Sequence, residues 1–531
     1  MQMKDGKKVC PENVYSSICP GCGLACGLYI RENISENGES SVSVDFRKSS
    51  PVNAGKLCRF GLKLPLYYAG PQASRVKGQD SGLEDAISET IRILKAAPAE
   101  SLAFFSVGNT TNEEQKVFSA LAGVFGLDVE TGMDVYSSLP ARMHNALNRS
   151  ISLEEVENAG QITLFVDPYS QYPLLLRRIL RAKEKGAEVI CIGPRQLSVA
   201  DKQFCLKPAE YVKSLCPSPK SVIIADIHPY SDPEHMKVVI DLAEASGSKI
   251  LFLKPFVNST GMETLAANRK QRTLKKLLQD IDSGKIKTLF CLESDLLELA
   301  PDREATVLTL SKLDTLIVQT SRQGEFFRLA DIVIASEQFY RKQGTVLNAE
   351  GRLLSAGGNS TIGFDILSSL AEAFGKQPDF ESVQKEVYES FGIKEAGDFA
   401  LKASFESYLI SDEPPEVETS CLKCKPGQEE SYRSFSETCT EPSPASFSAS
   451  LVYSLSPFMW HGLEDNNDFV ELNLQMARML GLKKGGTVKI RAQGKMADMK
   501  FRVSSIENGY LLSAQKLPVA SFSGNEVELS R

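Results

Sequence analysis

The sequence predicts an α/β fold in which a small cysteine-bearing N-terminal domain precedes doubly wound parallel-sheet domains and a C-terminal β-barrel. Three observations support this prediction. Short apolar runs alternate with amphipathic helical stretches over residues 80–375, the first 70 residues combine a cysteine cluster with little helical periodicity, and the runs after Ala449 resemble strands. The length of 531 residues agrees with three or four domains.

The composition is that of an ordinary folded protein, with 42% hydrophobic and 24% charged residues. A net charge of −7 argues against nucleic acid as the main partner. No apolar run approaches the ~18 residues that cross a membrane, and the N-terminal MQMKDGKKVCPEN lacks the apolar core of a secretory signal. We therefore expect a cytoplasmic protein that associates with a membrane only through partners.

The α/β part begins near Ser81 with a helical stretch, SGLEDAISETIRILKAA, whose early acidic residues suit the helix dipole. A buried strand over 101–108 and a second helix, NEEQKVFSALAGVFG, follow, with Gly126 as the C-cap. Six further apolar, β-branched runs predict strands at 161–167, 187–194, 221–227, 249–255, 287–293 and 315–321. Because such strands are apolar on both faces and separated by helices, they indicate parallel sheets covered by helices.

The composition changes to Ser, Pro, Glu and Cys over 411–448, which predicts a linker. The barrel then follows, with strands FVELNL, TVKIRA, MKFRVSS and YLLSA and turns at Lys483–Gly486 and Asn508–Gly509. The expected domains are 1–70, 71–410, the linker 411–448 and the barrel 449–531.

Four cysteines near the N-terminus, Cys19, Cys22, Cys26 and Cys58, have the spacing C-x2-C-x3-C-x31-C. The short spacings aim three thiolates at one centre, and the neighbouring glycines let backbone amides approach inorganic sulfides. Zinc also accepts four thiolates, but structural zinc sites usually pair two CxxC knuckles, whereas one knuckle here extends to three cysteines. The spacing therefore favours a [4Fe–4S] cluster over zinc or no metal.

The other cysteines give weaker signals. Cys421, Cys424 and Cys439 lie in the linker as C-x2-C-x14-C, which suits either free thiols or a second metal site with a ligand from elsewhere. Cys10 lies close to the cluster as a bystander. The remaining four lie in or beside apolar runs and are expected in the core: Cys191, Cys205, Cys216 and Cys291.

This cysteine pattern, followed by an α/β body and a terminal barrel, resembles the molybdopterin-oxidoreductase superfamily over most of the chain. The motifs that carry the resemblance are NAGKLCRFG, GNTTNEEQKVFSALAGVFG, AKEKGAEVICIGPRQ, ADIVIASEQFYRKQGTVLNAEGR and ELNLQMARMLGLKKGGTVKIRAQG. The superfamily includes formate dehydrogenases and the large iron–sulfur subunit of respiratory complex I. The resemblance implies a small N-terminal iron–sulfur domain, and it makes a molybdopterin guanine dinucleotide with Mo or W a candidate cofactor.

Two departures from the family pattern bear on function. Formate dehydrogenases carry a metal-ligating Cys or selenocysteine in the stretch that follows the helix of the GNTTNEEQKVFSALAGVFG motif. In this chain that stretch is VETGMDVYSSLPARMHN, which contains no cysteine. The candidate ligands there are Tyr136, Ser137, Ser138 and the later His144. Catalytic members also usually carry a lysine two residues after the fourth cysteine. Here that position is Phe60, with Arg59 and Lys63 as possible substitutes. Both departures resemble the complex I subunit, which keeps the fold and a cluster without molybdenum chemistry.

Several other residues are candidates with two interpretations each. Arg195 follows a strand, where open α/β sheets bind ligands, so it is either a contact to the pterin nucleotide or a surface arginine. Asn348 is either a cofactor contact or, with Glu350 and Arg352, part of a structural loop. His228, His235 and His461 are isolated in the sequence and are expected as surface or core residues. We assign no catalytic residue.

The sequence therefore predicts an iron–sulfur electron-transfer subunit of a multi-subunit oxidoreductase. Its expected partners are redox subunits that carry iron–sulfur clusters or flavin. A catalytic Mo or W bis-pterin enzyme of formate dehydrogenase type is the first alternative. The related formylmethanofuran dehydrogenase subunit is disfavoured, because it usually has its barrel on a separate chain and carries the active-site cysteine. A scaffold subunit with a vestigial fold is the third hypothesis.

Overall fold

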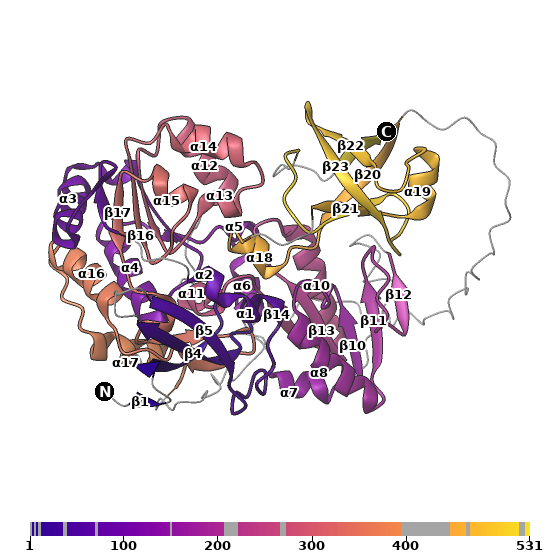
Figure 1. The fold of residues 1–531 in the computed structure, drawn as a ribbon, viewed down its shortest axis with the longest axis horizontal. Coiled ribbons are helices and arrows are strands. Elements are labelled where there is room, and N and C mark those ends of the chain that lie inside the picture. The colour runs from indigo at the N-terminus through magenta and orange to yellow at the C-terminus, as the bar shows by residue number, and fades with distance from the viewer. Residues whose placement is uncertain are drawn as a thin grey trace.

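The fold was obtained as a computed structural model, which describes residues 3–4, 7–8, 12–34, 40–68, 73–148, 151–205, 221–265, 272–393, 446–463, 468–519 and 526–531. Cys10, Cys216 and the three linker cysteines lie outside these residues. Five sheets and one closed barrel organise the described chain (Figure 1).

The N-terminal part is a three-stranded antiparallel sheet of β3 (Glu12–Ile18), β4 (Gly27–Ile34) and β5 (Ser40–Phe46). Two one-turn helices follow it, α1 (Arg59–Leu62) and α2 (Leu64–Tyr67). A short pair, β1 (Met3–Lys4) and β2 (Lys7–Lys8), precedes the sheet. The strands and turns expected around the first cysteines are confirmed.

A seven-stranded sheet with the order β7-β6-β17-β16-β15-β8-β9 forms the first α/β unit, and its β17, β16, β15, β8 and β9 are parallel. Its strands are β6 (Arg75–Val76), β7 (Gln79–Asp80), β8 (Leu102–Ser106), β9 (Val129–Glu130), β15 (Thr288–Leu292), β16 (Thr315–Thr320) and β17 (Ile332–Ala335). One face is covered by α3 (Leu83–Ala96), α4 (Asn112–Val124) and α16 (Ile362–Glu372), and the other by α12 (Leu274–Asp282), α13 (Leu296–Leu299) and α14 (Arg303–Leu310). Phe104 faces the first group of helices and Phe105 the second, so both strand faces are buried.

A fully parallel five-stranded sheet with the order β12-β11-β10-β13-β14 forms the second unit. Its strands are β10 (Gln161–Leu164), β11 (Glu188–Ile192), β12 (Lys202–Phe204), β13 (Ser221–Asp226) and β14 (Lys249–Leu253). Two helices, α8 (Pro173–Glu184) and α10 (Pro233–Ser246), pack on opposite faces. The predicted doubly wound architecture is thus confirmed in both units.

Short elements complete the α/β body. They are α5 (Asp134–Ser138), α6 (Ala141–Asn148), α7 (Leu153–Glu157), α11 (Ser259–Leu265), α15 (Glu325–Leu329), α17 (Phe380–Ser390) and the hairpin of β18 (Thr345–Leu347) and β19 (Leu353–Ser355), with the 3-10 turns η1 (Ala99–Ser101) and η2 (Phe339–Arg341). Gly126 has φ +70° directly after α4, the left-handed conformation expected of a glycine that ends a helix. Helix α6 begins at Ala141, after the separate helix α5.

The C-terminal part is a closed barrel with the order β20-β24-β21-β23-β22-β25. Its elements are β20 (Ser446–Tyr453), α18 (Pro457–Trp460), β21 (Phe469–Leu472), α19 (Leu474–Met479), β22 (Thr487–Ala492), β23 (Lys495–Val503), β24 (Tyr510–Ser513) and β25 (Glu526–Ser530). Strand β20 begins inside the range expected for the linker, and the rest of that linker lies outside the described residues. We keep the domain boundaries as a proposal.

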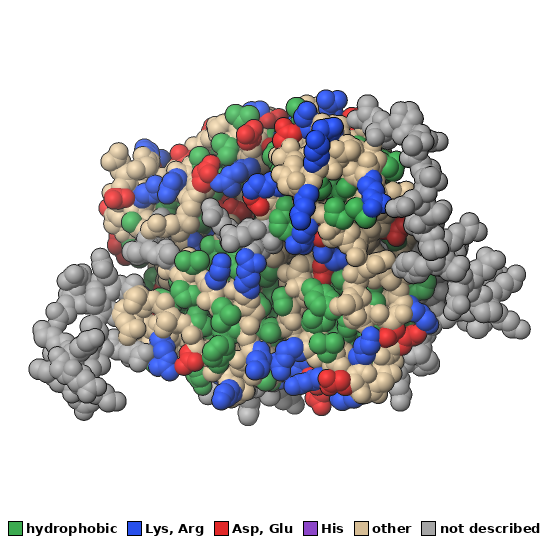
Figure 2. All heavy atoms as spheres, turned by 45° about the vertical axis from the view of Figure 1, so that its right-hand side comes forward, with side chains coloured by type: hydrophobic (Ala, Val, Ile, Leu, Met, Phe, Trp, Pro, Cys, Tyr) green, Lys and Arg blue, Asp and Glu red, His purple; other side chains and the backbone are tan. Residues whose placement is uncertain are grey.

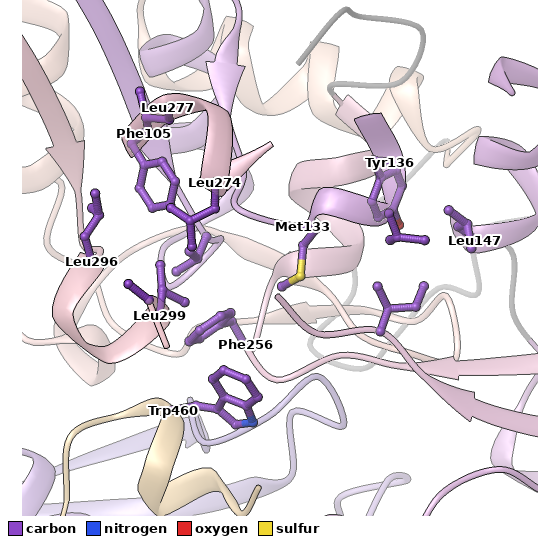
Figure 3. Packing of buried hydrophobic residues seen from close by; sticks show 14 of the residues in the cluster. Phe105, Met133, Tyr136, Leu147, Phe256, Leu274, Leu277, Leu296, Leu299 and Trp460 are labelled. Carbon is purple, nitrogen blue, oxygen red and sulfur yellow. The ribbon is translucent and has the colours of Figure 1, made fainter. Parts of the chain in front are cut away.

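The core that joins these parts is apolar and largely aromatic. Trp460 of α18 lies beside Phe256, which follows β14, with ring centroids 6.2 Å apart (Figure 3). This contact connects the segment between β20 and β21 of the barrel to both α/β units, because the same buried cluster contains Phe105 and Leu296 of the first unit. In the described chain, no helix is both long and apolar enough to cross a membrane.

Candidate functional site: a four-cysteine cavity and two sheet crevices

Four cysteine side chains line one small cavity at the N-terminal end of the molecule. Cys19, Cys22 and Cys26 lie on the loop between β3 and β4, and Cys58 directly precedes α1. The loop closes on itself, since the Cys19 amide donates to the Cys26 carbonyl at 2.7 Å and Ala25 adopts φ +53°. The structure therefore brings together all four cysteines that the sequence grouped.

The chemistry of this cavity is that of crowded thiols. Burial, together with the neighbouring Cys58 thiol, raises the pKa of Cys22 to about 12. Burial also raises the pKa of Cys19 and Cys26, again with contributions from neighbouring thiols. Four thiolates so close together need a compensating positive charge, which a metal centre supplies.

The arrangement of the thiols bears on which metal centre they suit. Among the described residues, no group of three or more His, Cys, Asp or Glu side chains could hold a single metal ion. The four thiols line one cavity. The Gly21 amide donates to the Cys19 sulfur at 3.4 Å, a contact typical of cluster-binding loops.

Two glycines allow the cysteine loop to pack tightly. A Cβ on Gly21 would overlap the ring of Phe60, and a Cβ on Gly23 would lie 2.9 Å from the Lys254 carbonyl oxygen. The Gly23 amide donates to that same oxygen at 2.8 Å. The end of β14 thus positions the cysteine loop.

The side chains around Phe60 form an aromatic wall beside the cavity. Phe60 contacts Phe458 and His461, with ring centroids 5.3 Å away in both cases. His461 Nε2 lies 3.2 Å from the Gly21 carbonyl, and burial lowers the pKa of His461 to about 3. His461, expected as an isolated residue, is therefore a buried neutral ring against the cysteine loop.

A buried lysine next to the cysteine loop was not predicted from the sequence. Arg59 is exposed, and Lys63 is half-buried over the Phe458 ring, so both stay near the surface. Lys254, which follows β14, is 1% exposed, and its Nζ donates to the Tyr136 hydroxyl at 2.7 Å. Burial lowers the pKa of Lys254 to about 7, while the charge of Glu263 opposes that effect.

The stretch expected to hold a metal ligand contains Tyr136 at its buried end. Ser138 is exposed and donates to the Asp134 carbonyl within α5. His144 is buried, with Nε2 3.2 Å from the Leu139 carbonyl and its ring 5.7 Å from that of Tyr136. The Ser137 side chain lies outside the described part of the structure. Tyr136, paired with Lys254, is the polar group that the described structure places at the centre of the molecule.

The crevice at the carboxyl ends of β8, β15, β16 and β17, here called the first crevice, contains a buried ionic network. Lys342 Nζ donates to both oxygens of Glu114, at 2.8 and 2.9 Å, and lies 3.6 Å from Glu293 and 3.9 Å from Glu337. All four side chains are at most 3% exposed. Burial raises the pKa of Glu114 to about 7 against the opposing charge of Lys342. Protein side chains thus fill the first crevice.

The crevice at the carboxyl ends of β10, β11 and β13, here called the second crevice, contains a cavity of about 220 Å³. The barrel covers it, because the Gln196 amide donates to the Ser505 carbonyl and the Glu507 amide to the Pro194 carbonyl. Three carboxylates line the cavity: Asp167, Asp226 and Asp232. His228 and His235 also line it, and burial lowers the pKa of both rings.

Comparison with known proteins identifies the group to which this chain is similar. Residues 12–67 match the Molybdopterin oxidoreductase Fe4S4 domain. The F420-dependent formate dehydrogenase subunit alpha of Methanocaldococcus jannaschii is 22% identical over 494 residues, which is 68% of this chain and 70% of that protein. The chain is thus similar to molybdopterin oxidoreductases in its N-terminal Fe4S4 domain and to a formate dehydrogenase alpha subunit over most of its length.

Two further proteins are similar to this chain, one in part of its sequence and one in its fold. The NADPH-Fe(3+) oxidoreductase subunit alpha of Geobacter sulfurreducens is 30% identical over 121 residues, 22% of this chain and 14% of that protein. The solved structure of the acetylene hydratase of Pelobacter acetylenicus has a TM-score of 0.54 at 11% identity and covers 94% of this chain and 92% of its own. That likeness shows the fold alone. Residues 12–67 therefore match a [4Fe–4S] domain, and the chain is similar to alpha subunits of oxidoreductases.

The superfamily's pterin dinucleotide can be compared with the two crevices. The first crevice does not fit such a group, because phosphates would displace Lys342 and meet three buried carboxylates. The second crevice has space, but its carboxylates suit the N–H edge of a ring better than a phosphate. Arg195 lines this second crevice, with its guanidinium paired to Asp167 at 3.1 Å and to Glu471 at 2.9 Å, and its contact to a pterin nucleotide stays a prediction.

Asn348 is fully buried, and both the nitrogen and the oxygen of its side-chain amide make hydrogen bonds. Its Nδ2 donates to the Leu24 carbonyl at 3.2 Å, and its Oδ1 accepts from the amides of Glu350 and Arg352. These bonds describe a structural turn that supports the cysteine loop. A direct contact of Asn348 with a superfamily cofactor stays a prediction.

The core cysteines follow their predicted pattern in part. Cys191 and Cys291 are 1% and 0% exposed, as the sequence predicted. Cys205 is half-exposed, because β12 is an edge strand.

Proposed function

We propose that this chain is an iron–sulfur electron-transfer subunit of a multi-subunit oxidoreductase. One [4Fe–4S] cluster, held by Cys19, Cys22, Cys26 and Cys58, would accept and release single electrons. The observation that carries the proposal is the cavity lined by all four thiols. When bound, the cluster supplies the redox chemistry. The chain's own residues supply the thiolate ligands, the Gly21 amide and the apolar enclosure.

The buried Tyr136–Lys254 pair supports a relay role over catalysis at Mo or W. The position where formate dehydrogenases carry a metal-ligating Cys or selenocysteine lies in the stretch that here contains Tyr136, whose hydroxyl is bonded to buried Lys254. The filled first crevice also argues against a bis-pterin enzyme. Because a single cluster has no onward carrier within the described chain, the proposal implies partner subunits with clusters or flavin. The cytoplasmic location stays part of this proposal.

The test is anaerobic purification of the full chain, followed by measurement of Fe, acid-labile sulfide, Zn, Mo, W and extracted pterin. We expect about four irons and four sulfides per chain, without stoichiometric Mo or W. Stoichiometric Mo or W with pterin would contradict the relay role and favour the catalytic alternative. Zinc alone, or no metal, would also contradict the proposal; in the latter case, the scaffold hypothesis would gain support.

Substitutions at two cysteines, Cys22 and Cys205, provide a test of the cluster ligands and its matched control. Cys22→Ser should abolish the visible absorption of the purified protein, because it removes a partly exposed ligand. Cys205→Ser, which changes a similarly exposed thiol directly after β12, should leave the spectrum unchanged.

A further inference from the structure

Two exposed leucines lie directly beside the cysteine cavity. Leu62 and Leu66, on α1 and α2, are 56% and 60% exposed, while Phe60 and Leu64 on the same two helices are buried. The Leu62 amide donates to the carbonyl of Cys58 at 3.0 Å. The Leu66 amide in turn donates to the Lys63 carbonyl at 2.9 Å, so Leu62 is connected directly to the backbone of a proposed cluster ligand and Leu66 through the next helical turn.

The cavity is least covered on this side. Cys22 and Cys58 are partly exposed, whereas Cys19 and Cys26 are buried. Leu57, which also lines the cavity, is only partly buried and lies in the same segment. An electron carrier bound to the four thiols would thus lie closest to solvent beneath α1 and α2.

Basic side chains surround the two leucines. Lys56 and Arg59 are exposed, and Lys63 is half-buried. This basic rim occurs in a chain whose net charge is −7. Figure 2 shows one face of the molecule on which Lys and Arg side chains mingle with hydrophobic ones across the middle and lower part.

We propose that the surface formed by Lys56, Arg59, Leu62, Lys63 and Leu66, here called the α1–α2 face, docks an acidic redox protein. The partner would place an apolar patch on the leucines and surrounding Asp and Glu residues on the basic rim. The proposal rests on the proposed function. An apolar centre with a charged rim is the usual anatomy of a transient protein interface, and opposite charges steer such encounters. One electron leaves the reduced cluster and reduces the partner's oxidised carrier, and no bond forms or breaks.

The experiment uses the full chain with its cluster and an acidic plant-type [2Fe–2S] ferredoxin as the probe. Stopped-flow absorbance measures the bimolecular electron-transfer rate in the downhill direction at low and high salt. We expect Lys56→Glu to lower the rate about tenfold at low salt and less at high salt, because screening weakens the lost attraction. Leu66→Glu should lower it about tenfold at low salt and keep part of that loss at high salt, because it removes an apolar contact as well as adding a like charge.

Matched controls lie far from the cavity in the sequence. Leu308→Glu changes a leucine that is 68% exposed on α14, and Lys484→Glu changes an exposed lysine in a barrel turn. Both controls should react within twofold of the unmodified chain. Rates unchanged in Lys56→Glu and Leu66→Glu, equal losses in the controls, or no reaction with ferredoxin would overturn the proposal.

Two measurements separate this proposal from its alternatives. Iron content and visible absorption should be unchanged in all four variants, so a docking failure is distinguished from loss of the cluster. Binding of the chain to vesicles with 30% phosphatidylserine, lost in Lys56→Glu and Leu66→Glu alone, would overturn the proposal in favour of an anionic membrane surface. No binding to such vesicles supports the protein partner.

Discussion

Lys254 Nζ donates a hydrogen bond of 2.7 Å to the Tyr136 hydroxyl, and the Lys254 carbonyl accepts one from Gly23 in the cysteine loop. One residue therefore connects the proposed cluster loop to the centre of the molecule. Burial raises the pKa of nearby Glu263 to about 7, against the charge of Lys254. The lysine thus stabilises a buried carboxylate as well as the tyrosine.

We expect Lys254→Met to lower the free energy of unfolding by about 3–5 kcal/mol, because it leaves Glu263 without its buried counter-charge. Tyr136→Phe should cost about 1 kcal/mol, the value of one hydrogen bond. Urea unfolding of both single variants and the double variant measures their coupling. Additivity within about 0.5 kcal/mol would contradict a direct contact.

Two Gly→Ala substitutions should have opposite effects on the protein, one disruptive and one stabilising. Gly23→Ala places a Cβ 2.9 Å from the Lys254 carbonyl oxygen, so we expect it to shift the loop and lower the retention of iron. Gly123→Ala lies in the exposed interior of α4 with open space around it, and should stabilise the chain by about 0.5–1 kcal/mol. Iron content and thermal unfolding check both. Equal iron retention in the two variants would contradict the close approach.

The first crevice allows a test of the ionic network. Lys342→Met removes the cation shared by Glu114, Glu293 and Glu337 and should destabilise the chain by about 3–5 kcal/mol. Glu337→Gln should cost less than about 1.5 kcal/mol, because its distance to Lys342 is 3.9 Å. Denaturant unfolding measures both changes. If Glu337→Gln were as unstable as Lys342→Met, the interaction of Lys342 with Glu337 would be as strong as its interactions with the two nearer carboxylates, contrary to their distances.

Much of the fold could be predicted from local sequence. Strands such as β13 and β15 are short apolar runs, and their alternation with helices predicts parallel sheets without long-range information. The four cysteines could be grouped because three of them lie within eight residues and the fourth has a familiar flanking motif. Local spacing alone was enough for both.

Lys254 and Lys342 could not be predicted, because their partners lie far away in the sequence. The Lys254–Tyr136 bond spans 118 positions and the Lys342–Glu114 pair spans 228. A lysine after a strand is usually solvated, so its local sequence suggests an exposed side chain. The available signal for Lys254 was its position inside the apolar run FLKPF. For Arg195, the position at the end of a strand could be predicted from the local sequence. Its ion pair with Glu471 of the barrel could not, because Glu471 lies far away in the sequence.

The contact between barrel and α/β body should depend on pH through Lys516. Its Nζ donates to the carbonyls of Leu297 and Ala300 at 2.7 and 3.1 Å. Burial lowers the pKa of Lys516 from 10.5 to about 8, and the charges of Glu298 and Asp295 oppose that effect. Between pH 8 and 10.5 the unfolded chain therefore binds more protons at this residue than the folded chain does.

More protons on the unfolded chain mean that stability contributed by Lys516 rises with pH over this window, by at most about 3 kcal/mol. Other groups titrate in the same range, so the measured quantity is the difference in unfolding free energy between the unmodified chain and Lys516→Met. We expect that difference to grow in favour of the unmodified chain from pH 8 to 10.5 and to be constant from pH 6 to 7. A difference independent of pH across the whole range would show that the pKa of Lys516 is not lowered by burial.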